Sequence, residues 1–148
     1  NLSEDAKRQI CAWKYGGEYD LYNLPAYEEM QVRQIGFMNP QREKNYYGFW
    51  DESILVGFVN ILEEKEEVFI GIGVNPDLCN KHYGQRMLLI TYEISKKLYP
   101  NKPLYLEVRT WNIRAVKCYQ KAGFRIDGQA YELTTGIGTG TFYRMIRE

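Results

Sequence analysis

The stretch GIGVNPDLCNKHYGQRMLL, residues 71–89, has the residue types and spacing of a site for a phosphate group. A predicted strand ends where Asn75-Pro76 cannot easily continue a ladder, and a helix is expected to begin between Lys81 and Gly84. The first N–H groups of a helix have no partner within it, and the helix dipole adds positive potential there. Such an end can hold a phosphate. A strand followed by a helix is also common without a ligand, so the loop alone leaves both interpretations open.

A second stretch, LYLEVRTWNIRAVKCYQKAGF, places three polar side chains around a predicted strand end. Glu107 lies late in the strand, Asn112 just past it as a natural N-cap, and Tyr119 on the following helix. About two helical turns separate Asn112 from Tyr119, so both can face one cleft. The alternatives are that Tyr119 packs against the protein and that Glu107 forms a salt bridge with Arg109 or a cation of another strand.

The cysteines predict neither a metal site nor a nucleophile. Cys11, Cys79 and Cys118 are odd in number and lack metal-like spacing, so we expect a reduced, cytosolic protein. The only histidine, His82, lies three residues from Cys79 in a predicted loop, which disfavours a cysteine hydrolase.

The first half of the chain predicts two helices and three strands. A helix after Ser3 has acids in its first turn and a stop at Gly16-Gly17, and a second has Pro25 near its start. Aromatic and β-branched residues then predict two strands joined by a tight turn, and a charged bend before a third strand. The expected ranges are helices over 4–13 and 24–35 and strands over 45–51, 54–62 and 68–74.

The second half predicts a helix over 81–98, a strand over 103–108 and a helix over 113–123 closed by Gly123. The apolar positions of the first of these helices are Met87, Ile90, Ile94 and Leu98. Two final strands, 124–127 and 141–147, are joined by a connection containing TTGIGTG, which no helix follows. This order predicts an α/β (α+β) fold with a mixed, mostly antiparallel sheet flanked by helices.

Length and charge narrow the function classes. The 148 residues suit one domain, 1–148, and the formal net charge of zero implies no general attraction to nucleic acid or anionic lipid. No apolar run approaches the roughly 20 residues that span a bilayer. The N-terminal stretch has no secretory pattern, so we expect no membrane partner and a cytoplasmic location.

Together, the two stretches resemble the acetyl-CoA-dependent GNAT superfamily of N-acetyltransferases. The first is similar to the pyrophosphate-binding motif of that family, and the second, with L-E-V-R, Asn112, Tyr119 and a closing G-F, to ribosomal-protein alanine acetyltransferases. The resemblance covers about a third of the chain. It implies a GNAT-like single domain with a splayed central strand pair, acetyl-CoA as co-substrate and no metal. The CoA-binding residues that it implies are Ile72, Gly73, Val74, Asn80, Lys81, His82, Tyr83, Gly84, Gln85 and Asn112.

The first motif departs from the family pattern Q/R-x-x-G-x-G/A. Cys79 replaces the Arg or Gln, and His82 replaces the first glycine, so only Gly84 remains. Phosphate is held chiefly by backbone N–H groups, so we expect binding to be retained. A histidine at position 82 must avoid a steric clash if the loop needs a positive φ there.

The mechanism that the resemblance implies is direct transfer from acetyl-CoA to a primary amine. Tyr119 would be the acid that returns a proton to the thiolate, and Glu107 the base that activates the amine. Histone-acetylating relatives have their base at the position of Val68, beside Glu67, and a water chain is a further alternative. A backbone N–H near Gly73 or Val74 would stabilise the oxyanion.

The acceptor stays open between small molecules and peptides, because the first third of the chain has no motif that defines it. A non-catalytic acyl-CoA-binding or sensor domain is the alternative function, suggested by the altered first motif. A nucleotide-binding protein is disfavoured because no Walker or dinucleotide glycine pattern is present. Dimerisation is common in such folds, and a homodimer is compatible with the resemblance.

Overall fold

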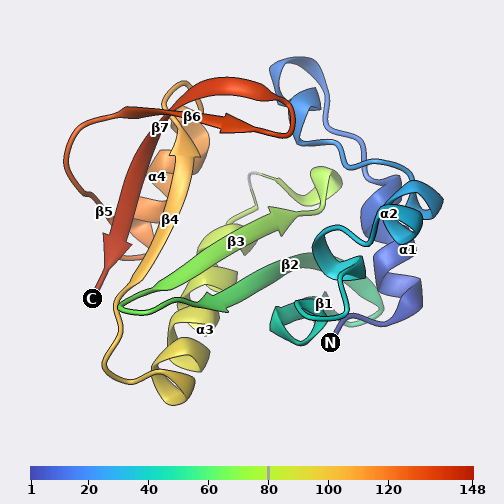
Figure 1. Cartoon of the computed structure of the whole chain (residues 1–148), viewed down its shortest axis with the longest axis horizontal. Helices are drawn as coiled ribbons and strands as arrows, with labels where there is room; N and C mark the ends of the chain where they lie inside the picture. Colours follow the sequence, from blue (N-terminus) through green and yellow to red (C-terminus); the bar gives the residue numbers. More distant parts are fainter. Residues whose placement is uncertain (80) are drawn as a thin grey trace. The chain divides into compact units, whose positions relative to one another are not determined.

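The computed structural model describes residues 1–79 and 81–148, so Asn80 lies outside the described residues. Seven strands form one sheet in the order β1-β2-β3-β4-β7-β5, with β6 also paired to β7 (Figure 1). The mixed, mostly antiparallel sheet flanked by helices that the sequence predicts is confirmed. The strands are β1 (Tyr46–Asp51), β2 (Ile54–Glu63), β3 (Val68–Val74), β4 (Leu104–Arg109), β5 (Arg125–Ile126), β6 (Tyr131–Thr135) and β7 (Gly138–Arg147).

The chain forms two compact units, and β2 and β3 contribute residues to both. The first unit comprises Asn1–Asn60 and Ile72–Tyr83, and the second comprises Ile61–Gly71 and Gly84–Glu148. The prediction that residues 1–148 are a single domain stays a prediction.

In the first unit, helix α1 (Glu4–Ala12) begins where its sequence signal predicts. Ser3 is the N-cap, and its Oγ accepts a hydrogen bond from the Ala6 N–H at 3.1 Å. The helix ends at Ala12, four residues before the glycine pair that was expected to stop it, because Trp13 already has extended backbone. Helix α2 (Tyr27–Arg33) starts after Pro25 and ends at Gln34, which has a left-handed φ of 52°.

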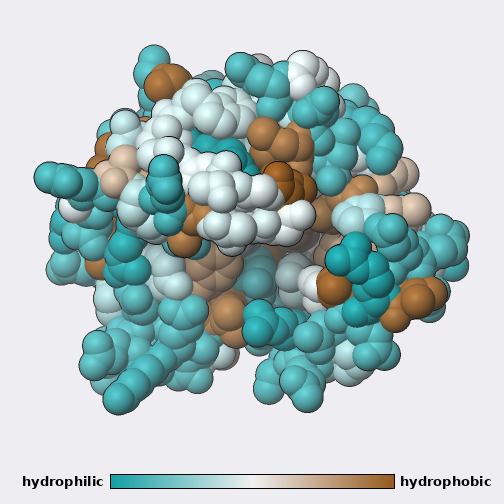
Figure 2. Space-filling model, turned by 45° about the horizontal axis from the view of Figure 1, so that its top comes forward, coloured by the Kyte–Doolittle hydropathy of each residue, from teal (hydrophilic) through white to brown (hydrophobic). Residues whose placement is uncertain are grey.

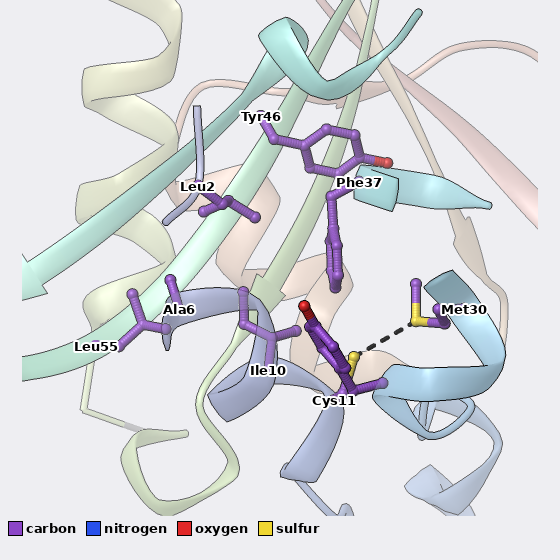
Figure 3. Close-up of a cluster of buried hydrophobic side chains, with 9 residues drawn as sticks. Leu2, Ala6, Ile10, Cys11, Met30, Phe37, Tyr46 and Leu55 are labelled. Atoms are coloured by element: carbon purple, nitrogen blue, oxygen red, sulfur yellow. Dashed lines mark hydrogen bonds between the residues drawn. The ribbon is translucent and has the colours of Figure 1, made fainter. Parts of the chain in front are cut away.

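The core of the first unit lies between α1, α2 and the β1–β2 hairpin, as Figure 3 shows. Ile10 and Phe37 are each 2% exposed, and the Cys11 thiol donates a hydrogen bond to the Met30 sulfur at 3.5 Å. This unit also contains four short 3₁₀ helices, which are η1 (Gly17–Tyr22), η2 (Gly36–Met38), η3 (Glu43–Asn45) and η4 (Pro76–Leu78).

The second unit is built around β4 and β7, which pair antiparallel over six residues. On its other edge, the first half of β7 pairs with β6 and its end pairs with β5. The parallel ladder between β3 and β4 consists of only two pairs, Val68 with Leu104 and Phe69 with Tyr105. Both strands continue past these pairs, which is the splayed central strand pair that the resemblance implies.

Helix α3 (Tyr83–Leu98) begins two residues later than predicted and buries a different face. Its buried residues are Met87, Leu88, Thr91 and Ser95. The predicted stripe is wrong after Met87, because Ile90 and Leu98 are each about half exposed. The Thr91 hydroxyl donates to the Met87 carbonyl at 2.7 Å, so a polar residue is accommodated in the buried face without an unpaired group.

The end of the chain differs from the sequence prediction by one strand. Helix α4 (Ile113–Lys121) is followed by Gly123, whose φ of 96° confirms the left-handed cap. The stretch that was expected to be a connection instead contains β6 and the start of β7, a hairpin closed by Gly136 and Ile137. The strand β6 was missed because its threonines and the following glycines are typical of a loop.

Candidate active site

The predicted site residues divide between the two units, and each group is described within its own unit. The first unit holds the end of β3 and the loop as far as Tyr83. The second holds Gly84, Gln85 and the whole downstream motif from Glu107 to Tyr119.

The end of β3 is anchored by hydrogen bonds within the first unit. The Val74 carbonyl accepts from the Tyr15 hydroxyl at 2.6 Å, and the Asn75 N–H donates to the Val56 carbonyl at 2.8 Å. A Cβ added at Gly73 would lie 2.3 Å from Cε1 of Phe58, so the absence of a side chain at position 73 lets this ring pack against the strand. The backbone of Ile72, Gly73 and Val74 is thereby held in a fixed position.

The loop after β3 is shaped by Asn75 and His82. The Asn75 Oδ1 accepts from the Asp77 N–H at 2.9 Å, which closes the turn into η4. Cys79 lies at the end of η4, where its thiol donates to the Asn75 carbonyl at 3.7 Å. Lys81 and His82 are exposed in the turn before α3. The loop thus leads directly into the helix that was predicted to hold a phosphate.

His82 has a φ of 64°, in the left-handed region that favours glycine. This is the position at which the resembled motif has its first glycine. The backbone at this position therefore has a conformation that glycine adopts readily, although the residue is a histidine. Histidine is among the residues enriched in this region, whereas a β-branched residue would be a steric outlier.

The N-terminus of α3 differs in charge from the first two helices. Both α1 and α2 have two acidic residues in their first turn, whereas α3 has none. Tyr83, its first residue, donates from its hydroxyl to the Asp51 carboxylate at 2.7 Å. Gly84 and Gln85 follow in the first turn and are half-buried. The positive end of the helix dipole is not offset by an acid of its own first turn, which suits an anionic ligand.

In the second unit, Asn112 caps α4 as the sequence predicts. Its Oδ1 accepts from the Ala115 N–H at 3.3 Å, and its side chain is buried. Its backbone N–H donates to the Arg109 carbonyl at 3.0 Å, which joins β4 to α4 through one tight turn. Tyr119 lies two turns along this helix and is half-buried. Its carbonyl accepts from the Phe124 N–H at 3.0 Å, so the segment after α4 is tied to this residue.

Glu107 has a partner that the sequence did not indicate. The Tyr131 hydroxyl donates to Oε2 of Glu107 at 2.6 Å, and the ion pairs among the described residues include none with Glu107. The salt-bridge alternative for Glu107 is therefore wrong. Burial and this hydrogen bond raise the pKa of Tyr131, so its phenol remains a donor to the carboxylate. Tyr131 was missed because β6 was missed, although the apolar alternation of YELTT could have indicated a strand.

The other two positions considered for the base are not suited to that role. Val68 is 0% exposed and apolar. Glu67 is held by Arg144, whose Nη1 donates to Oε1 at 3.1 Å and whose Nη2 donates to Oε2. The same guanidinium donates through Nε to the Asp127 carboxylate at 3.1 Å. Hydrogen bonding to Glu67 raises the pKa of Arg144, which keeps this network ionised.

Among the described residues, no group of three or more histidine, cysteine and acidic side chains is arranged to hold a metal ion. None of the helices in the described ranges has both the length and the apolar character needed to cross a bilayer.

The structure therefore has a mixed sheet in which the parallel ladder of β3 and β4 is only two pairs long, and each of these strands leads to a helix, α3 or α4, without acidic residues in its first turn. The acetyltransferase (GNAT) family model matches residues 8–124. The chain belongs to this family and is an acetyltransferase by its membership. A comparison with curated protein sequences finds no match.

Solved structures similar to this chain include N-acetyltransferases and an acetyltransferase in complex with CoA. A chimera of the Vibrio cholerae spermidine N-acetyltransferase SpeG and hSSAT has a TM-score of 0.75 and 18% identity, over 98% of this chain and 91% of that one. The Escherichia coli ribosomal-protein-S18-alanine N-acetyltransferase has a TM-score of 0.65 and 19% identity, over 98% and 88%. A Bacillus subtilis acetyltransferase in complex with CoA has a TM-score of 0.59 and 20% identity, over 80% and 82%. At these identities the likeness concerns the fold.

Proposed function

We propose that the protein transfers the acetyl group of acetyl-CoA directly to a primary amine. The observation that carries the proposal is the pair of helix starts. The turn before α3 keeps a left-handed residue at His82, and α4 is capped by Asn112 with Tyr119 two turns along. Family membership supports the acetyl group as what is transferred.

The donor would be held mainly by the backbone. Acetyl-CoA brings a pyrophosphate and an acetyl thioester. The N–H groups from Lys81 to Gln85 and the dipole of α3 suit the pyrophosphate, because no acid lies in the first turn of this helix. The backbone of β3 at Ile72 and Gly73 would pair with the amide groups of pantetheine, because the Val74 carbonyl already accepts from Tyr15. Asn112 is proposed as a further CoA-binding residue of the second unit.

Amine activation is assigned to Glu107. A primary amine with a lysine-like pKa of about 10.4 is almost fully protonated at neutral pH, so a proton must leave before attack. One oxygen of the Glu107 carboxylate accepts from Tyr131, and the other accepts no hydrogen bond from the described residues. The second oxygen can therefore accept the proton of the ammonium group, directly or through a water.

Tyr119 is assigned as the acid. The departing thiolate needs a proton, and a phenol, with an ordinary pKa of about 10, can supply one. The N–H of Gly73 or Val74 would stabilise the oxyanion that forms when the amine attacks. Fixed backbone donors suit this role because they need no reorganisation during the reaction.

The acceptor is proposed to be a small molecule or a peptide amine. The similar solved structures include enzymes named for spermidine and for a ribosomal-protein alanine, so both kinds belong in a test panel. The free thiols of Cys11, Cys79 and Cys118 support a reducing, cytoplasmic setting. A homodimer stays a prediction.

The test is thiol release from acetyl-CoA with a panel containing polyamines, amino acids and peptides that begin with alanine. We expect thiol release that depends on one class of amine, with the acetylated amine identified by mass spectrometry. Binding of CoA without acetylation of any amine would instead favour the alternative of a non-catalytic acyl-CoA-binding or sensor domain.

A further inference from the structure

Arg109 is a buried cation whose charge is not used by the proposed transfer. It is the last residue of β4 and only 9% exposed. Its guanidinium lies 4.7 Å from the centre of the Phe142 ring. A Cβ added at Gly140 would lie 2.1 Å from Nη1 of Arg109, so the missing side chain on β7 makes room for the guanidinium. Gly140 and Phe142 therefore hold this group against the sheet.

Other cations of limited exposure have acceptors, whereas Arg109 has none among the hydrogen bonds and ion pairs of the described residues. Lys7, 3% exposed, lies 3.0 Å from a Glu43 oxygen and 3.4 Å from a Glu4 oxygen. Arg144 binds two carboxylates, and Arg147 donates to the Ala122 carbonyl at 2.9 Å. A buried charge without a protein partner is unfavourable, so its retention calls for another explanation.

The guanidinium of Arg109 can still be reached from solvent. Among the described residues, the side-chain atoms that are both fully buried and unpaired are Oδ1 of Asn60 and Oγ of Ser95. The nitrogens of Arg109 are not among them, although they have no protein acceptor. Each of these nitrogens therefore keeps some exposure to solvent, and a planar guanidinium can bind a carboxylate through two parallel hydrogen bonds.

Arg109 shares a face of the sheet with Glu107. Residues two apart on a strand point to the same side, and their Cα atoms lie about 6.6 Å apart. Phe142 is opposite Arg109 in the ladder with β4 and opposite Tyr131 in the ladder with β6. One patch of the second unit therefore presents a carboxylate with its phenol donor and, one step along the strand, a guanidinium.

We propose that Arg109 binds a carboxylate of the acceptor, so that the acceptor is an amine with a carboxylate a few bonds away, as in an amino acid. This inference rests on the proposed function, because it takes Glu107 as the group that faces the amine. The opposite charges of Glu107 and Arg109 then orient an acceptor with an ammonium at one end and a carboxylate at the other. The phosphates of the donor are assigned to the start of α3 and do not compete for Arg109.

The test compares L-alanine, L-methionine and L-lysine with the amide of each, which keeps the shape and removes the negative charge. With the wild-type protein, kcat/KM should be at least tenfold higher for at least one amino acid than for its amide. Arg109→Gln should remove this preference by lowering the value for the amino acid, with the amide changed less than twofold. Arg109→Lys, which keeps the charge and loses the two-point geometry, should give an intermediate preference.

Arg125→Gln is the matched control, because Arg125 is exposed and pairs with Glu148 on the surface of the same unit. It should leave the preference unchanged. Circular dichroism and thermal melting establish that each variant is folded. If Arg109→Gln is unfolded, the comparison rests on Arg109→Lys.

Failure of the inference and failure of the proposed function give different results. Acetylation of the amides at rates equal to those of the amino acids, in wild type and variants alike, would overturn the role of Arg109 and leave the acetyltransferase intact. If no amine is acetylated, the role of Arg109 is tested by calorimetry, which measures the binding of the amino acid and of its amide with CoA present. Tighter binding of the amino acid than of its amide, lost in Arg109→Gln, supports the carboxylate site, and equal binding overturns it.

Discussion

At the scale of single residues, the hydrogen bond between Tyr131 and Glu107 is the contact with the clearest consequence for the proposed reaction. It fixes one oxygen of the carboxylate and so orients the other. Tyr131 is thus a positioning residue, which acts through Glu107.

Tyr131→Phe removes this hydroxyl and little else. We expect kcat to fall about tenfold, in line with the 1.5–3 kcal/mol typical of a hydrogen bond to a charged group, with KM for acetyl-CoA nearly unchanged. In a Glu107→Gln background the same substitution should have no further effect, because the oriented carboxylate is already lost. Tyr143→Phe, on the neighbouring β7, is the control. Independent, additive losses from the two substitutions would contradict the positioning role.

At the scale of elements, the close approach of Phe58 to Gly73 ties the aromatic core of the first unit to β3. The Phe58 ring makes contacts with Trp13, Phe37 and Tyr46 at centroid distances of 6.1–6.3 Å, so it has little freedom to move away. Gly73→Ala should lower the free energy of unfolding by about 1–3 kcal/mol, the usual range for overpacking. Urea unfolding of the variant and the wild type measures this difference in the free energy of unfolding. Gly16→Ala, where the added Cβ meets nothing within 4 Å, should change stability little.

At the same scale, the left-handed backbone of His82 in the turn before α3 leads to a second prediction. A β-branched residue at a φ of 64° is strained, so His82→Val should lower stability by about 1 kcal/mol or more and weaken acetyl-CoA binding. His82→Gly should keep the affinity within about twofold. Glu52→Val introduces the same kind of strain at a φ of 56° in the β1–β2 turn, and should lower stability without changing the affinity. Equal affinities of His82→Val and wild type, measured by calorimetry, would count against the loop as a phosphate site.

Most elements could be predicted from the sequence where local signals agree. Ser3 marks the start of α1, Asn112 that of α4, and the charged bend separates β2 from β3. The buried face of α3 could not be predicted, because Thr91 satisfies its hydroxyl within the helix and so can replace an apolar residue. Of the candidate site, the capping role of Asn112 was predicted from the sequence and is observed. The role of Glu107 as the base stays a proposal. The placement of Tyr131 and Arg109 beside it depends on pairing across β7, which local patterns do not reveal.

At the scale of the whole molecule, the first feature is the distribution of exposed hydrophobic side chains. The face drawn in Figure 2 is mostly hydrophilic, with hydrophobic side chains in small groups. Exposed apolar residues such as Val32 and Ile137 come from different elements, and scattered exposure of this kind is ordinary for a folded protein.

Stability should fall at alkaline pH. Burial is the largest cause that raises the pKa values of Tyr46, Tyr105 and Tyr131 above the ordinary value of 10, and carboxylates add to the effect for the last two. The unfolded chain releases these phenolic protons above pH 10 while the folded chain retains them, so these tyrosines leave the free energy of unfolding unchanged below this pH and decrease it above. Urea unfolding at pH 8 and pH 11 measures the loss. Tyr105→Phe should make the loss smaller, and an equal loss in this variant would contradict the assignment.

The most direct test of the proposed transfer is the rate of acetylation by Tyr119→Phe compared with that of the wild type, using the best amine of the panel. Tyr99→Phe, just after the end of α3, is the control. We predict that Tyr119→Phe lowers kcat at least tenfold while the Kd for acetyl-CoA, measured by calorimetry, changes less than twofold, because the hydroxyl acts on the departing thiolate and not in binding. A kcat equal to that of the wild type would remove Tyr119 from the mechanism and contradict the account.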